Sequence, residues 1–329
     1  MILPPFELHS PRSIEETVEL LGRYRNDCDL LAGGSDLLPN YKQRLNPKPH
    51  VISLEHVSEL RTISPTRIGA MARLADLARD SGLRATLPVI ADTAAQIASP
   101  LIIEQATIGG NVMLDTRCFY FNQSLFWRDS KGYCLKADGD VCLVVPQKEI
   151  CYATNSSDLA PVLMTLDASL VLVGPDGERT VPIRDFYRHD GIARFARRPD
   201  EILTFIEIPE AAREFRSAYR KLRIRDSIEF PAMGAAIALR LSEKTGDIAE
   251  LHITVGAVDT TPRSFEELTE SFVGRRLDEV TITEISSAVM SRIKPYNNVP
   301  LTPSYRKQMV GVYLKRMLGE LAELTPVGA

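Results

Sequence analysis

The spacing of apolar and polar positions divides the N-terminal part of the chain into short strands and helices. Short, mostly apolar segments over residues 29–32 and 51–54 predict two strands. A capping-box pattern over residues 13–16 predicts one helix, and Ser35-Asp36 marks the start of another. Residues 1–55 are therefore predicted to form a compact βαβ-like unit.

The central part of the chain, residues 56–212, carries a series of short elements. The hydrophobic pattern predicts strands near residues 63 and 68, helices over 74–81 and 87–99, and strands over 169–173 and 202–208. In this prediction Pro100 closes the second helix, and a Gly-Pro-Asp-Gly turn follows the third strand. A polar linker at 213–216 is the preferred boundary with the region that follows.

The C-terminal part, residues 213–329, is predicted to combine a sheet with helices. Alternating apolar positions predict three strands of an antiparallel meander, over 218–225, 232–241 and 248–258. The helical pattern then predicts helices over 265–272, 282–293 and 305–321. The fold class is therefore predicted as α+β, with one domain over 1–212 and a C-terminal α+β domain over 213–329 that contains a three-stranded antiparallel sheet.

Composition and charge narrow the class of protein. The chain has 329 residues, a net charge of −4 and interspersed charges of both signs, which argues against nucleic acid as the main partner. No apolar run approaches the roughly 20 residues of a membrane helix. The first residues lack a basic region followed by an apolar core, so we expect no signal peptide and a cytoplasmic protein.

Four of the five cysteines lie in one window of little periodicity, which we interpret as an inserted loop region over about 115–152. They are Cys118, Cys134, Cys142 and Cys151, in steps of 16, 8 and 9 residues. Four thiolates are the full ligand set of a tetrahedral zinc ion or of a 4Fe–4S cluster. The window has neither a C-x-x-C pair nor a ferredoxin spacing, so both metals remain open. The alternative is that some cysteines are buried packing residues, which fits Cys142 and the isolated Cys28 best.

Two glycine pairs lie where a ligand could approach the backbone. Gly33-Gly34 stands between a predicted strand and a predicted helix, and Gly109-Gly110 is flanked by Thr107 and Asn111. Backbone N–H groups at such turns can face an anion, and two such elements could hold both phosphates of a dinucleotide. The alternative is a pair of plain glycine turns, since neither G-x-G-x-x-G nor a P-loop is present.

Other charged residues give weaker signals. Alternation places Lys221, Arg223 and Arg225 on one face of a predicted strand, where they could meet a phosphate, a flavin or a partner, or form a solvated surface. The five histidines are scattered along the sequence, so no histidine-based metal site or catalytic triad is predicted.

The glycine elements resemble the two FAD-binding signatures of the flavin-carrying medium subunit of the molybdenum hydroxylases, the xanthine dehydrogenase and carbon monoxide dehydrogenase group. The resemblance rests on Ala32-Gly33-Gly34-Ser35-Asp36-Leu37-Leu38, Thr107-Ile108-Gly109-Gly110-Asn111 and Ser157-Asp158-Leu159-Ala160-Pro161. It spans almost the whole chain and implies FAD between an N-terminal subdomain (1–55) and a middle subdomain (56–212). The cofactor-binding residues that it implies are Leu31, Ala32, Gly33, Gly34, Ser35, Asp36, Leu37, Thr107, Gly110, Asn111, Asp158 and Lys221.

The cysteine window resembles an insertion in one branch of that family, the beta subunits of 4-hydroxybenzoyl-CoA reductase. Asp115-Thr116-Arg117-Cys118 and Cys151-Tyr152-Ala153-Thr154 are among the similar segments. In that branch the insertion carries an additional 4Fe–4S cluster. The resemblance therefore implies that the four cysteines of the window are its ligands.

The resemblance implies an electron-transfer subunit that performs no substrate chemistry itself. Electrons from ferredoxin would pass through the 4Fe–4S cluster and FAD to a 2Fe–2S small subunit and a molybdopterin-binding large subunit, where 4-hydroxybenzoyl-CoA would be reduced to benzoyl-CoA. A dimer of such heterotrimers is expected. Two alternatives remain: the flavin subunit of an oxidising molybdenum hydroxylase that passes electrons to NAD or a quinone, and a zinc-stabilised scaffold without redox activity.

Overall fold

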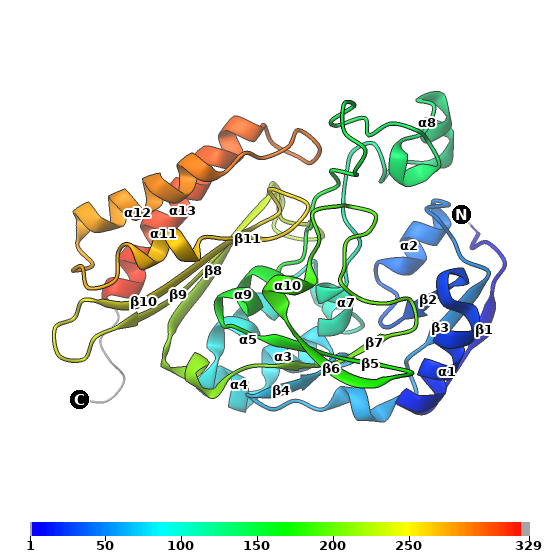
Figure 1. Ribbon diagram of the computed structural model, residues 1–329, viewed down its shortest axis with the longest axis horizontal. Coiled ribbons are helices and arrows are strands. Elements are labelled where there is room, and N and C mark those ends of the chain that lie inside the picture. Colours follow the sequence, from blue (N-terminus) through cyan, green and yellow to red (C-terminus); the bar gives the residue numbers. More distant parts are fainter. Residues whose placement is uncertain (1, 324–329) are drawn as a thin grey trace.

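The computed structural model describes residues 2–323 and arranges them in three successive units, each with its own sheet (Figure 1). The N-terminal unit and the C-terminal sheet with its long helices lie at opposite ends of the molecule, and the middle unit lies between them. A loop region that carries the short helix α8 (Leu125–Ser130) projects from the middle unit on the side of the N-terminal unit.

The N-terminal unit is a parallel three-stranded sheet in the order β1–β3–β2, with helix α1 packed against it. Its elements are β1 (Glu7–His9), α1 (Ile14–Tyr24), the 3-10 turn Arg25–Asp27, β2 (Cys28–Leu31), α2 (Leu37–Lys42) and β3 (His50–Ser53). The Ser13 hydroxyl caps α1 by accepting a bond from the backbone N–H of Glu16 at 3.1 Å. The βαβ unit is therefore present as predicted, but β1 has only three residues and gave no periodic signal.

The middle unit is built on a four-stranded sheet in the order β4–β7–β5–β6, which helices cover. Its first elements are the 3-10 turn Ser58–Arg61, β4 (Arg67–Gly69), α3 (Leu74–Arg79), α4 (Ser81–Thr86), α5 (Pro88–Ala95), α6 (Pro100–Ile103) and α7 (Ile108–Val112). After α8 and the 3-10 turn Leu135–Ala137 come α9 (Leu159–Thr165), β5 (Ser169–Gly174), β6 (Gly177–Pro182), α10 (Ile183–Phe186), β7 (Ile202–Glu207) and the 3-10 turn Glu210–Glu214. Pro100 begins a helix rather than closing one, because its fixed φ suits a first turn that Ser99 caps.

The C-terminal sheet has four strands, in the order β11–β10–β9–β8, so the prediction of a three-stranded sheet was wrong by one edge strand. The elements are β8 (Arg216–Leu222), β9 (Met233–Leu241), β10 (Ile248–Gly256), β11 (Arg263–Ser264), α11 (Glu266–Glu270), α12 (Glu279–Arg292) and α13 (Pro303–Glu323). The extra strand has two residues, too few to show an alternation. Strand β8 also ends at Leu222, so Arg223 and Arg225 do not continue the face that carries Lys221.

Strand β9 joins the C-terminal unit to the middle unit because both of its faces are buried. Ala236 and Ala238 belong to the core of the middle unit, whereas Ile237 and Leu239 pack in the core beneath α12 and α13. The small alanine side chains let α9 lie close to the sheet. The two units are therefore held in one fixed arrangement by a shared strand.

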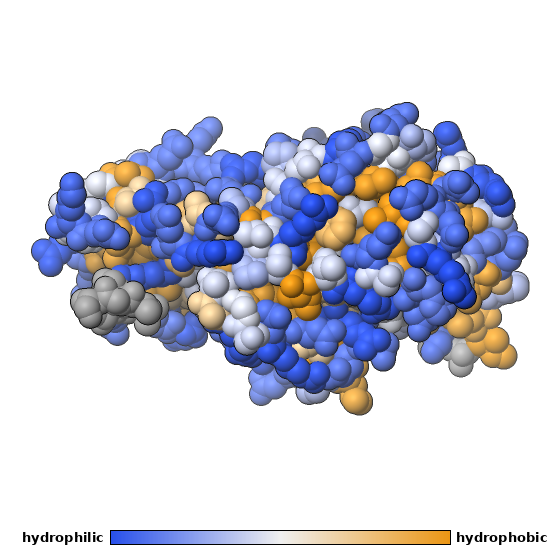
Figure 2. Space-filling model, turned by 90° about the horizontal axis from the view of Figure 1, so that it is seen from below, coloured by the Kyte–Doolittle hydropathy of each residue, from blue (hydrophilic) through white to orange (hydrophobic). Residues whose placement is uncertain are grey.

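Hydrophilic side chains cover most of the face shown in Figure 2, and apolar groups gather toward its middle. Within residues 2–323, none of the helices combines the length and the apolar character needed to cross a membrane.

Arg306 fixes the start of α13 from inside the protein. Its side chain is fully buried and donates hydrogen bonds to the backbone carbonyls of Ala232, Ala257 and Tyr296, each at 2.8 Å. Burial lowers the pKa of the guanidinium to about 10, so it still carries its charge at neutral pH.

We predict that Arg306→Met lowers the free energy of unfolding by about 3 kcal/mol or more, because two buried carbonyl groups and one part-buried carbonyl group lose their donor. Arg316→Met, on the exposed side of the same helix, is the matched control and should change stability by less than about 0.5 kcal/mol. Urea unfolding of the two variants measures the difference. Equal stability of the two variants would contradict this role of Arg306.

Candidate functional site

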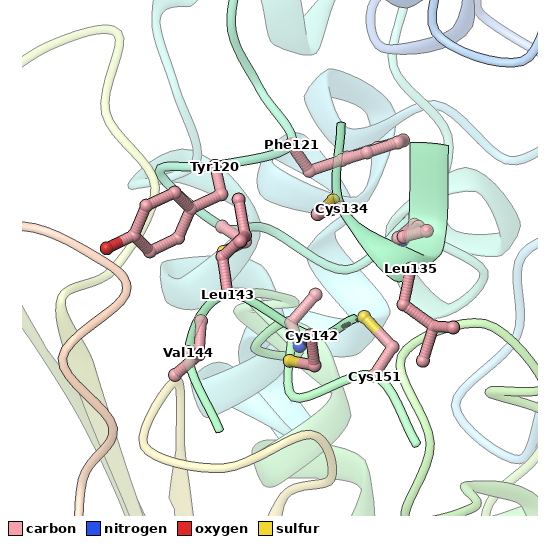
Figure 3. A pocket seen from close by; sticks show the side chains of 11 residues that line it. Tyr120, Phe121, Cys134, Leu135, Cys142, Leu143, Val144 and Cys151 are labelled. Atoms are coloured by element: carbon pink, nitrogen blue, oxygen red, sulfur yellow. Dashed lines mark hydrogen bonds between the residues drawn. The ribbon is translucent and has the colours of Figure 1, made fainter. Parts of the chain in front are cut away.

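The four cysteines of the window come together around one pocket (Figure 3). Cys118, Cys134, Cys142 and Cys151 are all buried, and none of them forms a disulfide. The space between them is about 250 Å³, including its opening to solvent. The other lining residues are Tyr120, Phe121, Leu135, Lys136, Leu143, Val144 and Ala153. Cys142, which also fits a simple packing role, lines this pocket with the other three cysteines.

The separation of the four sulfur atoms distinguishes between kinds of metal centre. No three of them lie within 4.8 Å of one another. Around a tetrahedral zinc ion with Zn–S bonds of about 2.3 Å, neighbouring sulfur atoms would be about 3.8 Å apart. In a 4Fe–4S cluster each thiolate binds a different iron atom, so the sulfur atoms lie farther apart. The donor set therefore suits a polynuclear cluster better than one zinc ion.

The residues around the pocket are mostly apolar but include the cation of Lys136. Burial raises the pKa of the Cys118 thiol to about 12 and that of Cys151 to about 11. The buried Lys136 ammonium lies beside the thiols, 2.6 Å from the Asp115 carboxylate. Burial lowers the pKa of Lys136, and Asp115 offsets part of this effect. A cation in this position would partly balance the negative charge of four metal-bound thiolates.

Backbone pairing holds the two ends of the cysteine segment together. Arg117 and Thr154 exchange two backbone hydrogen bonds, of 2.8 and 2.7 Å. The fully buried Asn298, from the C-terminal unit, donates to the Tyr152 carbonyl at 2.6 Å and accepts from the Thr154 hydroxyl at 3.0 Å. The base of the insertion is therefore closed by its own backbone pairing and anchored to the C-terminal unit.

Gly191 allows Cys151 to take its place at the pocket. A Cβ atom at position 191 would lie 2.8 Å from the Cys151 Sγ atom, so a side chain there would collide with the sulfur. The Gly191 N–H also donates to the Cys151 carbonyl at 2.7 Å. The sequence offered no signal for this glycine, because its role depends on a segment 40 residues away.

The first glycine pair lies against the segment that leads into the second, although more than 70 residues separate the two pairs in the sequence. A Cβ atom on Gly33 would lie 1.9 Å from the Gln105 carbonyl oxygen, and one on Gly109 would lie 2.6 Å from the Ala70 carbonyl oxygen. These two glycines therefore allow close packing of the backbone. Gly34 instead has φ +69°, and Gly110 is exposed, with only the Thr107 hydroxyl near its missing Cβ.

The remaining residues of the first glycine element surround this junction. Leu31 is the last residue of β2, and Leu37 is the first residue of α2. Between them, Ala32 is half-buried and Ser35 is exposed. The Asp36 carboxylate pairs with Arg117, which comes from the cysteine segment. Helices α2 and α7 have only six and five residues, so a helix dipole adds little to anion binding here.

The second glycine element continues into a buried polar network. The Asn111 side-chain oxygen accepts hydrogen bonds from the Ser157 hydroxyl at 2.8 Å and from the Leu159 N–H at 3.0 Å. Between these two residues, the buried Asp158 carboxylate accepts from the Tyr219 hydroxyl at 2.9 Å and lies 3.2 Å from the Lys221 ammonium. Burial raises the pKa of Asp158, and the Lys221 charge offsets part of that rise.

The structure thus brings the predicted flavin-binding residues into one connected region, and their roles remain predictions. The sequence alone did not indicate that Tyr219 and Lys136 contribute to these sites. Tyr219 lies two positions before Lys221 on β8, so strand alternation could have indicated it. Lys136 was surrounded by loop sequence and gave no signal.

We predict that Asp158→Asn lowers the free energy of unfolding by about 3–5 kcal/mol, because Lys221 would be left buried without a counter-ion. The double variant Asp158→Asn/Lys221→Met should recover part of this loss, since it removes both charges. Glu320→Gln, which breaks the exposed pair with Arg220, is the control and should cost less than about 1 kcal/mol.

Urea unfolding of these variants measures the coupling. The interpretation fails if the double variant is as unstable as the sum of the Asp158→Asn and Lys221→Met single variants, since the two side chains would then act independently.

Comparisons with known proteins agree along the whole chain. Residues 4–211 match the family described as the FAD binding domain in molybdopterin dehydrogenase, and residues 217–321 match the CO dehydrogenase flavoprotein C-terminal domain. The carbon monoxide dehydrogenase medium chain of Afipia carboxidovorans is 30% identical over 320 residues, which cover 96% of each chain. The xanthine dehydrogenase FAD-binding subunit of Escherichia coli O157:H7 is 25% identical over 318 residues, which cover 95% of this chain and 94% of the relative.

A solved structure of carbon monoxide dehydrogenase from Hydrogenophaga pseudoflava has a similar chain, with a TM-score of 0.80 and 26% sequence identity. The similarity covers 98% of both chains.

Proposed function

Because the chain belongs to the family of FAD-binding medium subunits of the molybdenum hydroxylases, we propose that it is the electron-transfer subunit of a heteromeric molybdenum enzyme. The family predicted from the glycine motifs is confirmed, and the relatives are oxidoreductase subunits. In this proposal its partners are a molybdopterin-binding large subunit and a 2Fe–2S small subunit, in a dimer of heterotrimers. No residue of this chain is assigned to substrate chemistry.

FAD would be held where the N-terminal and middle units meet. The fit rests on backbone that no Cβ atom covers, at Gly34 and Gly110, and on the exposed Ser35 between the two units. Thr107 caps α7 and holds the Gly110 N–H at 3.1 Å, which fixes the shape of the second element. The buried polar network of Asn111, Asp158 and Lys221 would support the site from the protein interior. Bound FAD would supply the means to exchange electrons one or two at a time.

The cysteine pocket would hold a 4Fe–4S cluster. One observation carries this part of the proposal: four buried cysteines from an irregular segment, a full ligand set for such a cluster, converge on one pocket, and no three of their sulfur atoms lie within 4.8 Å of one another. Lys136 would offset the charge of the thiolates, and Phe121 would keep water from one side of the pocket. A bound cluster would supply a one-electron centre.

A second redox centre in addition to the flavin would favour the 4-hydroxybenzoyl-CoA reductase beta subunit as the specific role, with ferredoxin as electron donor. The flavin subunit of an oxidising hydroxylase that reduces NAD or a quinone fits the family equally well. The zinc-stabilised scaffold is a further alternative, but the sulfur separations do not favour it.

We predict that the purified chain contains FAD together with about four iron atoms and about four acid-labile sulfides. Cys134→Ser should abolish or alter the electron paramagnetic resonance signal of the reduced cluster. Cys28→Ser removes a buried cysteine outside the pocket and should leave iron, sulfide and the signal unchanged. FAD without iron would reject the cluster, and one zinc ion with no flavin would support the scaffold instead.

A measurement of the direction of electron flow requires the assembled complex. We predict that the heterotrimer, supplied anaerobically with reduced ferredoxin, converts 4-hydroxybenzoyl-CoA to benzoyl-CoA, measured by chromatography. In a Cys134→Ser complex that retains its FAD, the rate of this conversion should fall at least about tenfold. Oxidation of a substrate coupled to NAD reduction, without any benzoyl-CoA, would favour the oxidising hydroxylase.

A further inference from the structure

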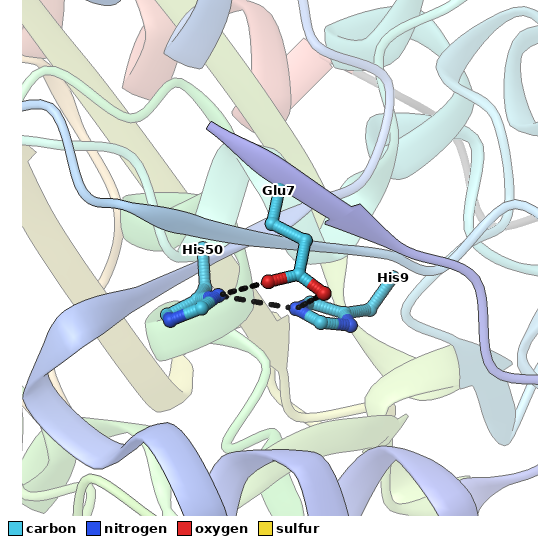
Figure 4. Close-up of side chains that lie close together, drawn as sticks. All are labelled: Glu7, His9 and His50. Atoms are coloured by element: carbon cyan, nitrogen blue, oxygen red, sulfur yellow. Dashed lines mark hydrogen bonds and ion pairs between the residues drawn. The ribbon is translucent and has the colours of Figure 1, made fainter. Parts of the chain in front are cut away.

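Three side chains of types that commonly bind metals gather on the N-terminal sheet, outside the cysteine pocket (Figure 4). Glu7 and His9 are two residues apart on β1, so their side chains point to the same face of the sheet. The parallel pairing of β1 and β3 places His50 directly beside Glu7. Strand register alone therefore brings one carboxylate and two imidazoles together.

The donor atoms already have the spacing of ligands around one ion. The His9 Nε2 and His50 Nδ1 atoms are 3.2 Å apart, and the Glu7 oxygens lie 3.4 Å from His50 Nδ1 and 3.9 Å from His9 Nε2. In a tetrahedral zinc site with bonds of about 2.0–2.2 Å, neighbouring donors are about 3.3–3.6 Å apart. An ion placed between these atoms would require only small side-chain movements.

Aromatic stacking holds the two imidazole rings in place. The Tyr24 ring, at the end of α1, stacks on His50 with a centroid distance of 3.9 Å and on His9 with a centroid distance of 4.8 Å. The histidine side chains are 13% and 23% exposed, whereas that of Glu7 is 64% exposed. The site is thus fixed on its inner side and open to water on its outer side.

The ligand atoms of the cluster interact with one another: His9 Nε2 and His50 Nδ1 share a hydrogen bond, and Glu7 contacts both rings. Among residues 2–323, the ion-pair partners of Glu7 are His9 and His50 alone, with no lysine or arginine. A second triad, formed by Asp167, Glu250 and His252, provides a contrast. Arg184 pairs with Asp167, Arg240 pairs with Glu250 at 2.6 Å, and the His252 Nδ1 atom lies 2.8 Å from the Thr165 carbonyl. The carboxylates of the second triad therefore already have arginine partners, and its imidazole already has a backbone partner.

We propose that Glu7, His9 and His50 bind a divalent transition-metal ion of the zinc type, with water in the fourth position. Two imidazoles and one carboxylate form a borderline donor set that suits zinc and disfavours calcium or magnesium. The ion would tie the three-residue edge strand β1 to β3 and so stabilise the N-terminal unit. This site is separate from the flavin and cluster sites and does not depend on their assignment.

The test compares zinc binding by the full-length wild-type chain with binding by His50→Gln. After chelator treatment, both proteins are dialysed against Zn²⁺, and zinc per chain is measured by elemental analysis. Wild type should bind one zinc ion more per chain than His50→Gln, because any zinc bound by the cysteines is common to both. Zinc should also raise the thermal unfolding midpoint of wild type more than that of the variant.

Two further variants keep the test decisive. Glu7→Gln alters an exposed side chain, so it should fold normally and bind the additional zinc at least about tenfold more weakly, as measured by competition with a chromophoric chelator. His252→Gln, in the second triad, should bind zinc as wild type does. Equal zinc content and affinity in wild type and Glu7→Gln, or loss of the additional zinc in His252→Gln alone, would overturn the proposal.

Discussion

The buried Asp158 carboxylate is the constraint around which the units of this protein are arranged. A charge removed from water is tolerated only beside its partners, and here both partners, Tyr219 and Lys221, come from the C-terminal sheet. The residues on either side of Asp158 are held by Asn111 from the second glycine element. Movement of any one of these three segments would leave a buried charge or a buried donor unpaired. The C-terminal sheet is therefore locked to the region proposed to hold FAD.

The cysteine segment obeys a different constraint, because it contains little regular structure that could fold by itself. Its base is held by the pairing of Arg117 with Thr154 and by Asn298. Arg117 also pairs with Asp36, so one side chain links the base of the cysteine segment to the first glycine element. The proposed cluster and flavin sites thus rest on shared supports. Such coupling would keep the distance between two redox centres constant, which electron transfer between them requires.

The sequence predicted elements with clear periodicity and missed those that depend on distant contacts. Strands β2, β3, β5 and β7–β10 lie close to their predicted positions, whereas β1 and β11 were too short to show alternation. Motif resemblance identified the glycine pairs, but only the structure shows that Gly33 and Gly109 serve packing while Gly110 stays exposed. Cysteine spacing left zinc and iron–sulfur open, because ligation depends on distances in space. The histidines looked scattered for the same reason, since a parallel strand pairing brings His9 and His50 together.

The two proposed metal sites differ in what assembles them. The cysteine pocket gathers four buried thiols from loops, so the proposed centre would replace their protons and bridge the loops. At Glu7, His9 and His50, the register of β1 and β3 and the Tyr24 ring set the geometry without any ion. The first site would therefore be formed together with its cluster during folding. The second would exist beforehand and exchange its ion with solvent, because its carboxylate and its fourth position face water.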